Sequence, residues 1–330
     1  MGEDAGMPDG PVFIVGCGRS GTSLLRRFLN QHLQLGIPLE SLFIVDYLQA
    51  AARYPVGRMT GLLVREPEVR EWGVSPSRED LAGCSTIAEA IDRLHRLYLS
   101  PRNKSRWGQK TPRFVRYLPL LQAHFPNARF VHLVRDPRAV AASLIRSNVH
   151  RSTAYYAARR WRMDVDFGLA HERVSPASVQ RIAYEDLVAQ PERVVREVCA
   201  FCNLEFDPGM LATPEARGSE YSDFYAQIHA NVDRPATMDF VDRWAEDLSP
   251  EEIAWIESVA GDRMIELGYA PVSSAQPSLP SGWQNRRDRI GRMIGQTAQY
   301  ARRRPGYLVF LLYRKARLGL LKSFLWSVNY

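Results

Sequence analysis

Apolar residues in this chain gather in short runs, and the first of them is followed by a polar turn and then by apolar residues at helical spacing. The run Val12 to Val15 is too short and too β-branched for a helix, so we predict a strand there. The next residues, Gly16 to Gly21, include three glycines and interrupt regular structure. From Thr22 onward, apolar side chains recur at helical spacing, at Leu24, Leu25, Phe28 and Leu29. The pattern predicts a strand, a tight loop and a helix.

Two further runs predict buried strands, at residues 129–134 and 179–184. The first ends in Arg135, Asp136 and Pro137, where Asp136 can cap a helix that runs to Ser147 and Pro137 can occupy its first turn. Helical spacing recurs in other segments, which we predict as helices: 41–52, 86–99, 114–124, 151–172, 191–201 and 238–267. Strands, polar turns and helices therefore alternate along much of the chain.

Composition adds size and environment to this picture. A chain of 330 residues, 45% of them hydrophobic, can form one large domain or two small ones with a sizeable core. The four cysteines are too few for a disulfide framework, and helix packing is a better interpretation of Cys199 and Cys202 than a zinc or redox site. No charged-then-apolar leader opens the chain, and no apolar run reaches the roughly 18 residues of a membrane helix. These features favour a reducing cytoplasm.

The positive charge is concentrated at one end of the chain. Residues 281–330 contain eleven Lys or Arg and a single acid, Asp288, which is a net charge of +10. Of the total of +7, residues 1–280 therefore carry −3. The basic character belongs to a C-terminal tail and not to the body of the protein.

Candidate chemistry is concentrated in the loop after the first predicted strand. A Gly-rich turn between a strand and a helix aims backbone N–H groups and a helix N-terminus at one point, where an anion can bind. Arg19 adds a charge, and Ser20, Thr22 and Ser23 add hydroxyl groups. An ordinary strand-to-helix turn is the alternative, but these donors favour phosphate binding.

The kind of phosphate follows from one missing lysine. Gly16 and Gly21 have the spacing of the nucleotide-hydrolysing P-loop G-x-x-x-x-G-K-[ST], but Thr22 stands where that motif has its lysine. The cation is instead inside the loop. The stretch Gly18-Arg19-Ser20-Gly21-Thr22-Ser23 resembles the 5′-phosphosulfate loop of sulfotransferases, which use 3′-phosphoadenosine 5′-phosphosulfate (PAPS). The resemblance implies that these six residues bind PAPS and that Arg19 also serves catalysis.

Two segments after the loop extend the resemblance to the reacting groups. Ile37-Pro38-Leu39-Glu40 is similar to the Pro-containing turn that carries the general base of tyrosylprotein and many bacterial sulfotransferases, which implies this role for Glu40. An acid at a helix N-terminus, mildly stabilising, is the alternative. Lys110, before Thr111-Pro112, resembles the lysine that reaches the transferring sulfuryl group, although an exposed loop lysine would also fit.

A second phosphate site is the more specific match. Arg135 at a strand end and Ser143 on the following helix have the eight-residue spacing that marks the 3′-phosphate site of sulfotransferases. A salt-bridged arginine and a helix-face serine are the alternative for this pair alone. Tyr184 resembles a tyrosine near the bound nucleotide, or is an edge of the core. Arg234 resembles a phosphate contact in a late loop, and His229 is a surface histidine by default.

The resemblance covers roughly residues 11–270 and implies an α/β fold, a P-loop-type three-layer sandwich with a central parallel sheet. We predict a disordered N-terminus at 1–10, a sulfotransferase domain at 11–275 with a helical insertion at 53–105, and a basic, partly apolar C-terminal extension at 276–330. The insertion is where acceptor specificity would lie. The implied reaction needs PAPS as co-substrate and no metal.

The chain is thus similar to a PAPS-dependent sulfotransferase that acts on a hydroxyl-bearing acceptor, which can be a glycan, a lipid-linked sugar, a peptide or a metabolite. Basic residues flank a short apolar aromatic run in the tail, so residues 286–326 favour an anionic membrane surface, peripheral at its inner face. Packing of the tail on the body is the main alternative, and nucleic acid is less favoured. A small-molecule P-loop kinase and a non-enzymatic basic adaptor acting through its tail are the competing functions.

Overall fold

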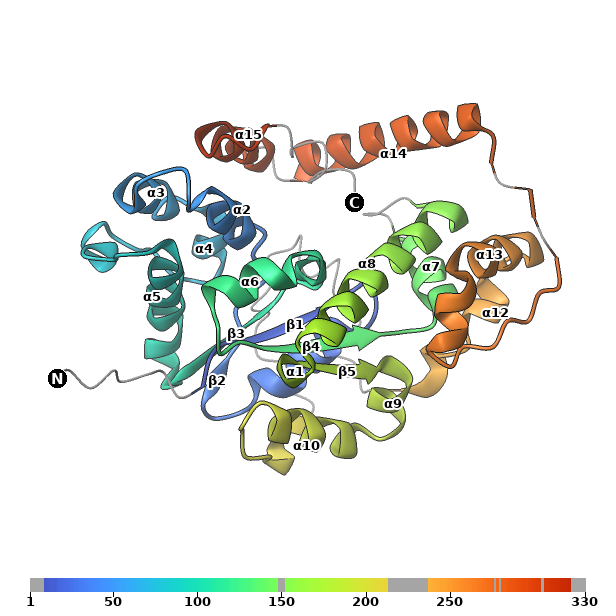
Figure 1. Ribbon diagram of the computed structural model, residues 1–330, viewed down its shortest axis with the longest axis horizontal. Coiled ribbons are helices and arrows are strands. Elements are labelled where there is room, and N and C mark those ends of the chain that lie inside the picture. The colour runs from blue at the N-terminus through green and yellow to red at the C-terminus, as the bar shows by residue number, and fades with distance from the viewer. Residues whose placement is uncertain are drawn as a thin grey trace.

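A parallel β-sheet lies at the centre of the protein (Figure 1). The computed structural model describes residues 9–147, 152–212, 237–275, 277–278, 280–303 and 306–321. The strands are β1 (Val12–Gly16), β2 (Leu35–Gly36), β3 (Arg106–Lys110), β4 (Arg129–Val134) and β5 (Val179–Ala183). Their order is β2-β3-β1-β4-β5, and all neighbours pair in parallel. The loop after β1 therefore lies among the carboxyl ends of the strands, where open α/β sheets bind ligands.

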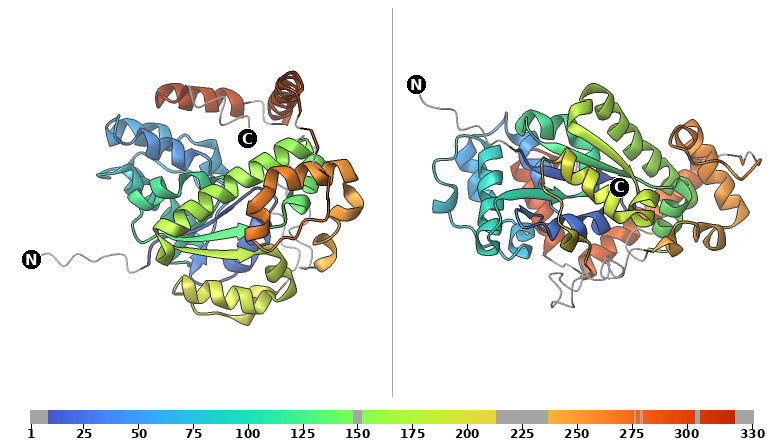
Figure 2. Two further views of the ribbon diagram at one scale, coloured as in Figure 1. Left: turned by 45° about the vertical axis from the view of Figure 1, so that its right-hand side comes forward. Right: turned by 90° about the horizontal axis from the view of Figure 1, so that it is seen from below.

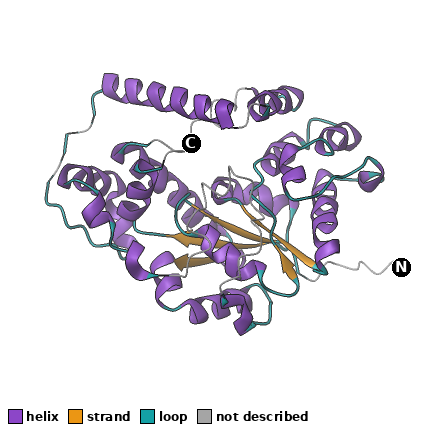
Figure 3. Ribbon diagram, turned by 180° about the vertical axis from the view of Figure 1, so that it is seen from behind, coloured by secondary structure: helices purple, strands orange, loops and turns teal. Residues whose placement is uncertain are grey.

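Helices cover both faces of the sheet, which confirms the predicted three-layer α/β sandwich (Figures 1 and 2). One face packs on helices α1 (Thr22–Asn30), α9 (Tyr184–Ala189) and α10 (Pro191–Phe201). The other packs on α2 (Phe43–Ala50), α5 (Ile87–Leu99), α6 (Leu118–His124) and α8 (Ala154–Val174). Phe13 faces one layer and Ile14 the other, so β1 is apolar throughout because it is buried on both sides. Seen from behind, the strands lie enclosed between helices (Figure 3).

The strand β3 was not predicted from the sequence. Its residues, Arg106 to Lys110, include only one large apolar side chain, yet all five are buried. Polar groups here find partners inside the protein: Arg106 Nε donates to Gly10 O at 2.8 Å and Trp107 Nε1 to Asp92 Oδ1 at 2.8 Å. Hydrogen-bonded polar side chains replaced the apolar pattern by which a buried strand is recognised.

Two predicted helices are divided in the structure. Residues 112–117 form a 3₁₀ turn, and α6 starts only at Leu118 because Pro119 fits a first helical turn. The region predicted as helical over 238–267 is not continuous. It separates into a 3₁₀ turn (Met238–Phe240), α12 (Trp244–Asp247) and α13 (Pro250–Glu266), because Ser249 and Glu252 form a capping box that starts a new helix. α13 and α7 (Pro137–Ile145) pack on α8.

The predicted insertion, residues 53–105, contains α3 (Val56–Leu63), α4 (Pro67–Glu71) and α5, together with short 3₁₀ turns. The helix expected at 86–99 is therefore present as α5, with Thr86 Oγ1 capping its first turn by accepting from Glu89 N. Of the segment 1–10 that we predicted to be disordered, residues 1–8 lie outside the described residues.

The C-terminal tail forms α14 (Gly282–Arg303) and α15 (Tyr307–Arg317), which run along one side of the molecule (Figure 1). α14 contacts α8 through Tyr156, whose ring lies 3.7 Å from the Arg292 guanidinium. α15 packs against the body, so for this helix the structure favours the packing alternative over the membrane surface. Within the described residues, no helix is long and apolar enough to span a membrane.

Two cations of α15 are buried among acids of the body. Arg314 and Lys315 are only 1% and 3% exposed. Arg314 donates to Asp46 at 3.1 Å, to Glu66 at 2.8 Å and to Glu68 at 3.2 Å, and Lys315 donates to Asp46 at 2.6 Å. We call these five residues the tail-anchoring cluster. The sequence predicted a basic surface in the tail, but these two of its charges are neutralised inside the protein.

The tail-anchoring cluster predicts a pH-dependent stability. Two cations face three carboxylates, so a proton on one carboxylate balances the charge, and burial raises the pKa of Glu66 from 4.5 to about 7. A raised folded-state pKa gives stability that is present below the unfolded pKa and lost as pH rises through about 7. Glu66→Gln, which stays neutral, should therefore be more stable than the parent at about pH 8, by on the order of 2 kcal/mol, and nearly equal to it at about pH 4.

Urea unfolding of both proteins across this range measures the difference. Glu192→Gln serves as the control, because Glu192 pairs with Arg196 on an exposed face of α10. A Glu66→Gln difference that does not change with pH would show that Glu66 does not titrate there.

Candidate functional site

The loop after β1 has the backbone of an anion-binding nest. Arg19 adopts φ 77°, a left-handed conformation that is uncommon for a residue other than glycine, and Gly21 follows with φ 91°. Left-handed residues between ordinary ones turn successive backbone N–H groups toward one point. Helix α1 begins immediately afterwards at Thr22, so its N-terminus faces the same point. Within the described residues, only Asn103 and Asn203 share the positive φ of Arg19 among non-glycine residues. The sequence pattern that predicted an anion site here therefore corresponds to a suitable backbone geometry.

Gly21 also allows the loop to pack closely on Tyr184. A Cβ at Gly21 would lie 2.2 Å from Tyr184 Cδ2, so any other residue would displace this ring. The guanidinium of Arg135 lies 4.1 Å from the centroid of the same ring, on which it makes a cation–π contact. Tyr184 thus joins the loop to the end of β4.

Two residues predicted from separate motifs meet at Arg19. Arg19 Nε donates to Ser143 Oγ at 2.9 Å, and Arg135 Nη1 donates to Arg19 O at 3.2 Å. Arg135 is fixed further by its own carbonyl, which accepts from Trp161 Nε1 at 2.8 Å. Burial and the nearby Arg135 charge lower the pKa of Arg19. Two arginines this close repel each other, and an anion between them would relieve that repulsion.

The carboxylate and the lysine predicted to act on the reacting groups are also in contact. Lys110, at the end of β3, donates to Glu40 Oε1 and, at 3.1 Å, to Ser23 Oγ of α1. Burial lowers the pKa of Lys110, and the Glu40 carboxylate opposes this shift. Lys110 is buried whereas Glu40 stays partly exposed, so the carboxylate can be reached from solvent. Lys110 therefore connects Glu40 to the loop side of the site.

The turn that carries Glu40 is held from three sides. Arg26 of α1 donates to Ile37 O at 2.7 Å. Gln109 Nε2 and Trp72 Nε1 both donate to Leu39 O, at 3.0 and 3.1 Å. These bonds fix the backbone on both sides of Pro38, so Glu40 is positioned by rigid elements. The sequence did not indicate Arg26, Gln109 or Trp72 because each acts on a backbone carbonyl.

The loop region contains buried donors that suit phosphate oxygens. Among the described residues, Ser20 Oγ and Arg135 Nε are buried and have no hydrogen-bond partner. Buried polar atoms are rarely left without a partner, and both can donate to an oxyanion. The residues present therefore fit a nucleotide with phosphate groups at two positions.

Arg160 of α8 is a further cation at the loop, and no motif in the sequence indicated it. A Cβ at Gly18 would lie 2.9 Å from Arg160 Nη2, which places this guanidinium against the loop backbone. Arg160 also lies 3.7 Å from the buried Asp164. The available signal was its spacing from Asp164, since residues four apart on a helix are neighbours.

Other predicted positions fall outside this site. Arg234 and His229 lie outside the described residues. Cys199 and Cys202 are buried in the core with free thiols, as the packing interpretation requires. In the part of the chain that the structure describes, no group of three His, Cys, Asp or Glu could hold a metal ion.

Comparison with known proteins identifies the family. The model of the sulfotransferase family matches residues 11–208. The chain belongs to the sulfotransferase family. That match includes the loop, Glu40, Lys110, Arg135, Ser143 and Tyr184.

Two similar proteins and one solved structure match most of this chain. Protein-tyrosine sulfotransferase A of Caenorhabditis elegans is 24% identical over 279 residues, which is 79% of this chain and 67% of that protein. The nodulation protein NoeE of Sinorhizobium fredii is 27% identical over 286 residues, 78% of this chain and 65% of that protein. The chain thus spans about two thirds of the length of these two relatives. The sulfotransferase domain from the curacin biosynthetic pathway shares the fold, with a TM-score of 0.56 and 23% identity over 79% of this chain and 98% of that one.

Proposed function

We propose that this sulfotransferase uses PAPS as its donor and transfers the sulfuryl group to a hydroxyl acceptor, with Glu40 as general base. The observation that carries the donor assignment is the contact of Arg19 with both Ser143 and Arg135. Ser143 and Arg135 lie 124 and 116 positions after Arg19 in the sequence, and they meet it at a loop with anion-binding geometry. A 5′-phosphosulfate and a 3′-phosphate need two such groups of donors side by side.

The donor-side roles follow from charge and position. The N–H groups of the loop, Ser20 and Arg19 bind the 5′-phosphosulfate, with Gly18, Gly21, Thr22 and Ser23 completing the loop. Arg135 and Ser143 bind the 3′-phosphate, which distinguishes PAPS from ATP, and a planar guanidinium suits a dianionic phosphate. Tyr184 supports Arg135 through its ring. Arg234, outside the described residues, is proposed as a further phosphate contact.

The acceptor-side roles concern one proton and one developing charge. Bound PAPS supplies an activated sulfuryl group with a phosphate as leaving group. As the acceptor oxygen bonds to sulfur in line with the breaking sulfur–oxygen bond, Glu40 takes the hydroxyl proton. Lys110, beside Glu40 and Ser23, stabilises the negative charge that develops on the transferring group. When the Glu40 carboxylate takes the proton, Lys110 is released from it and turns toward the developing charge.

The names of relatives suggest which acceptor to examine first. Several are protein-tyrosine sulfotransferases, so a tyrosyl phenol in a peptide is the first candidate, and glycan, lipid-linked sugar and metabolite hydroxyls are the others. We propose residues 53–105 as the insertion that selects among them. A cytoplasmic, reducing environment remains a prediction from the sequence.

Arg135→Ala tests the 3′-phosphate assignment. We expect the affinity for 3′,5′-adenosine bisphosphate to fall on the order of 100-fold, because a charge-assisted pair to a phosphate is lost. The affinity for 5′-AMP, which lacks the 3′-phosphate, should change by only a few-fold. Isothermal titration of both nucleotides with both proteins gives the comparison.

Arg129→Ala is a matched control, because Arg129 starts the strand whose other end precedes Arg135. Equal losses for the bisphosphate and for AMP would mean that Arg135 supports the loop in general and does not bind the 3′-phosphate.

A further inference from the structure

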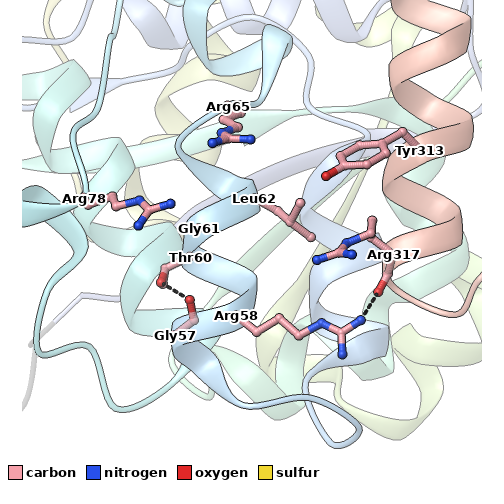
Figure 4. Close-up of a pocket in the computed structure, with 9 residues that line it drawn as sticks. All are labelled: Gly57, Arg58, Thr60, Gly61, Leu62, Arg65, Arg78, Tyr313 and Arg317. Atoms are coloured by element: carbon pink, nitrogen blue, oxygen red, sulfur yellow. Dashed lines mark hydrogen bonds between the residues drawn. The ribbon is translucent and has the colours of Figure 1, made fainter.

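A pocket of about 330 Å³ lies where α15 meets α3 (Figure 4). It shares no lining residue with the loop, Glu40 or Lys110. Its charged lining residues are all arginines, and no acid lines it; the side chains concerned are Arg58, Arg65, Arg78 and Arg317. Arg317 and Tyr313 come from α15, Arg58 and Arg65 from the region of α3, and Arg78 from the segment after α4. In the close-up, Arg78 and Arg317 reach toward α3 from opposite sides.

These four arginines have no acidic partner within the residues that the structure describes. Arg58 contacts only neutral groups: it donates to Arg317 O at 3.3 Å and lies 4.3 Å from the Tyr54 ring centroid. Neighbouring helices pair their arginines, as α5 does for Arg96 with Asp92 at 2.6 Å. All four are exposed to solvent. Like charges that converge repel one another, and a bound anion would relieve that repulsion.

Two glycines keep the pocket open. Gly57 and Gly61 lie one turn apart on α3 and line the pocket, and a Cβ at either would meet nothing within 4 Å. Glycine inside a helix costs roughly 1 kcal/mol relative to alanine. Larger side chains would fit sterically at both positions, but they would project into the space in front of the arginines.

We propose that this pocket binds a pyrophosphate-type group, a compact oxyanion with at least two negative charges. Guanidinium groups bind such oxygens in bidentate fashion, and the Tyr313 hydroxyl can donate as well. The volume admits a diphosphate. Because α15 supplies two lining residues and the body supplies the rest, the bound anion joins the tail to the body at a second point beside the tail-anchoring cluster. This site is independent of sulfuryl transfer.

The test compares the wild-type full-length protein with an Arg65→Ala/Arg78→Ala double variant. Each is titrated with inorganic pyrophosphate, and binding is measured by calorimetry and by the shift in melting temperature. Neither arginine belongs to the proposed PAPS site, so weak binding of pyrophosphate at the loop would persist in the double variant. We expect the double variant to lose a binding event at least tenfold tighter than whatever remains. Arg53→Ala/Arg70→Ala removes the same charge from exposed positions outside the pocket and should leave that event intact.

Flotation with phosphatidylcholine vesicles, with and without diacylglycerol pyrophosphate, identifies the source of the group. If only the parent protein binds the vesicles that carry the diphosphate lipid, and the double variant also loses pyrophosphate binding, the anion is a lipid headgroup. Loss of pyrophosphate binding alone assigns it to a soluble diphosphate. Identical pyrophosphate isotherms for all three proteins would overturn the proposal.

Discussion

Glu40→Gln should lower kcat for sulfuryl transfer by roughly two to four orders of magnitude, the usual contribution of a positioned general base. The amide keeps the shape of the side chain and can still accept from Lys110, so affinity for 3′,5′-adenosine bisphosphate should stay within a few-fold of the parent value. Steady-state kinetics and nucleotide titration on the same preparations separate the two effects. Glu192→Gln, on an exposed face of α10, is the control for loss of a carboxylate.

The choice of acceptor distinguishes a base from a residue that only positions Lys110. A nitrophenol loses its proton more readily than an ordinary phenol and therefore depends less on a base. The loss in Glu40→Gln should thus be smaller with the nitrophenol than with the phenol. An equal loss with both acceptors would indicate that Glu40 acts through Lys110 and not on the acceptor proton.

Arg314→Leu should destabilise the protein by about 3–5 kcal/mol, the range observed when one partner of a buried ion pair is removed. Arg314 is only 1% exposed, and it donates to Asp46, Glu66 and Glu68. Without Arg314, Lys315 is the one cation of the tail-anchoring cluster that remains beside its three carboxylates. Urea unfolding at neutral pH measures the loss.

Arg317→Leu is a matched control one turn along α15, since Arg317 is exposed and should change stability by less than about 0.5 kcal/mol. The tail-anchoring cluster is also connected to the candidate site through Glu68. Glu68 Oε2 accepts from Leu42 N at 2.6 Å, two residues after Glu40. If Arg314→Leu unfolds at the same urea concentration as the parent protein, the tail-anchoring cluster does not contribute to stability.

The elements that carry Arg19, Arg135 and Ser143 could be predicted from the sequence because their signals are local. Residues 12–30 combine an apolar strand, a Gly-rich turn and a helix, and β4 with α7 repeats the arrangement, so motif spacing alone places Arg19, Arg135 and Ser143. Parallel strands then bring their carboxyl ends together, which is a general property of the fold.

Interactions between distant segments could not be predicted in this way. β3 has a polar sequence, and its side chains can be buried because Gly10, Asp92 and Leu39 supply partners for them. The acids that bury Arg314 lie 246 to 268 positions earlier, so the tail was read by its charge as a surface. Arg26 and Arg160 act on the loop and turn from helices, where their spacing resembles that of ordinary surface arginines.

The protein is incubated with PAPS and a panel of tyrosyl peptide, phenol, glycan and lipid-linked sugar acceptors, beside parallel reactions with ATP and Mg²⁺. Mass spectrometry follows both nucleotides and acceptors. A PAPS-dependent sulfotransferase should form 3′,5′-adenosine bisphosphate in the same amount as one sulfated acceptor, and no acceptor should gain phosphate from ATP. A phosphorylated acceptor with ATP, and no sulfated product with PAPS, would contradict the proposed function.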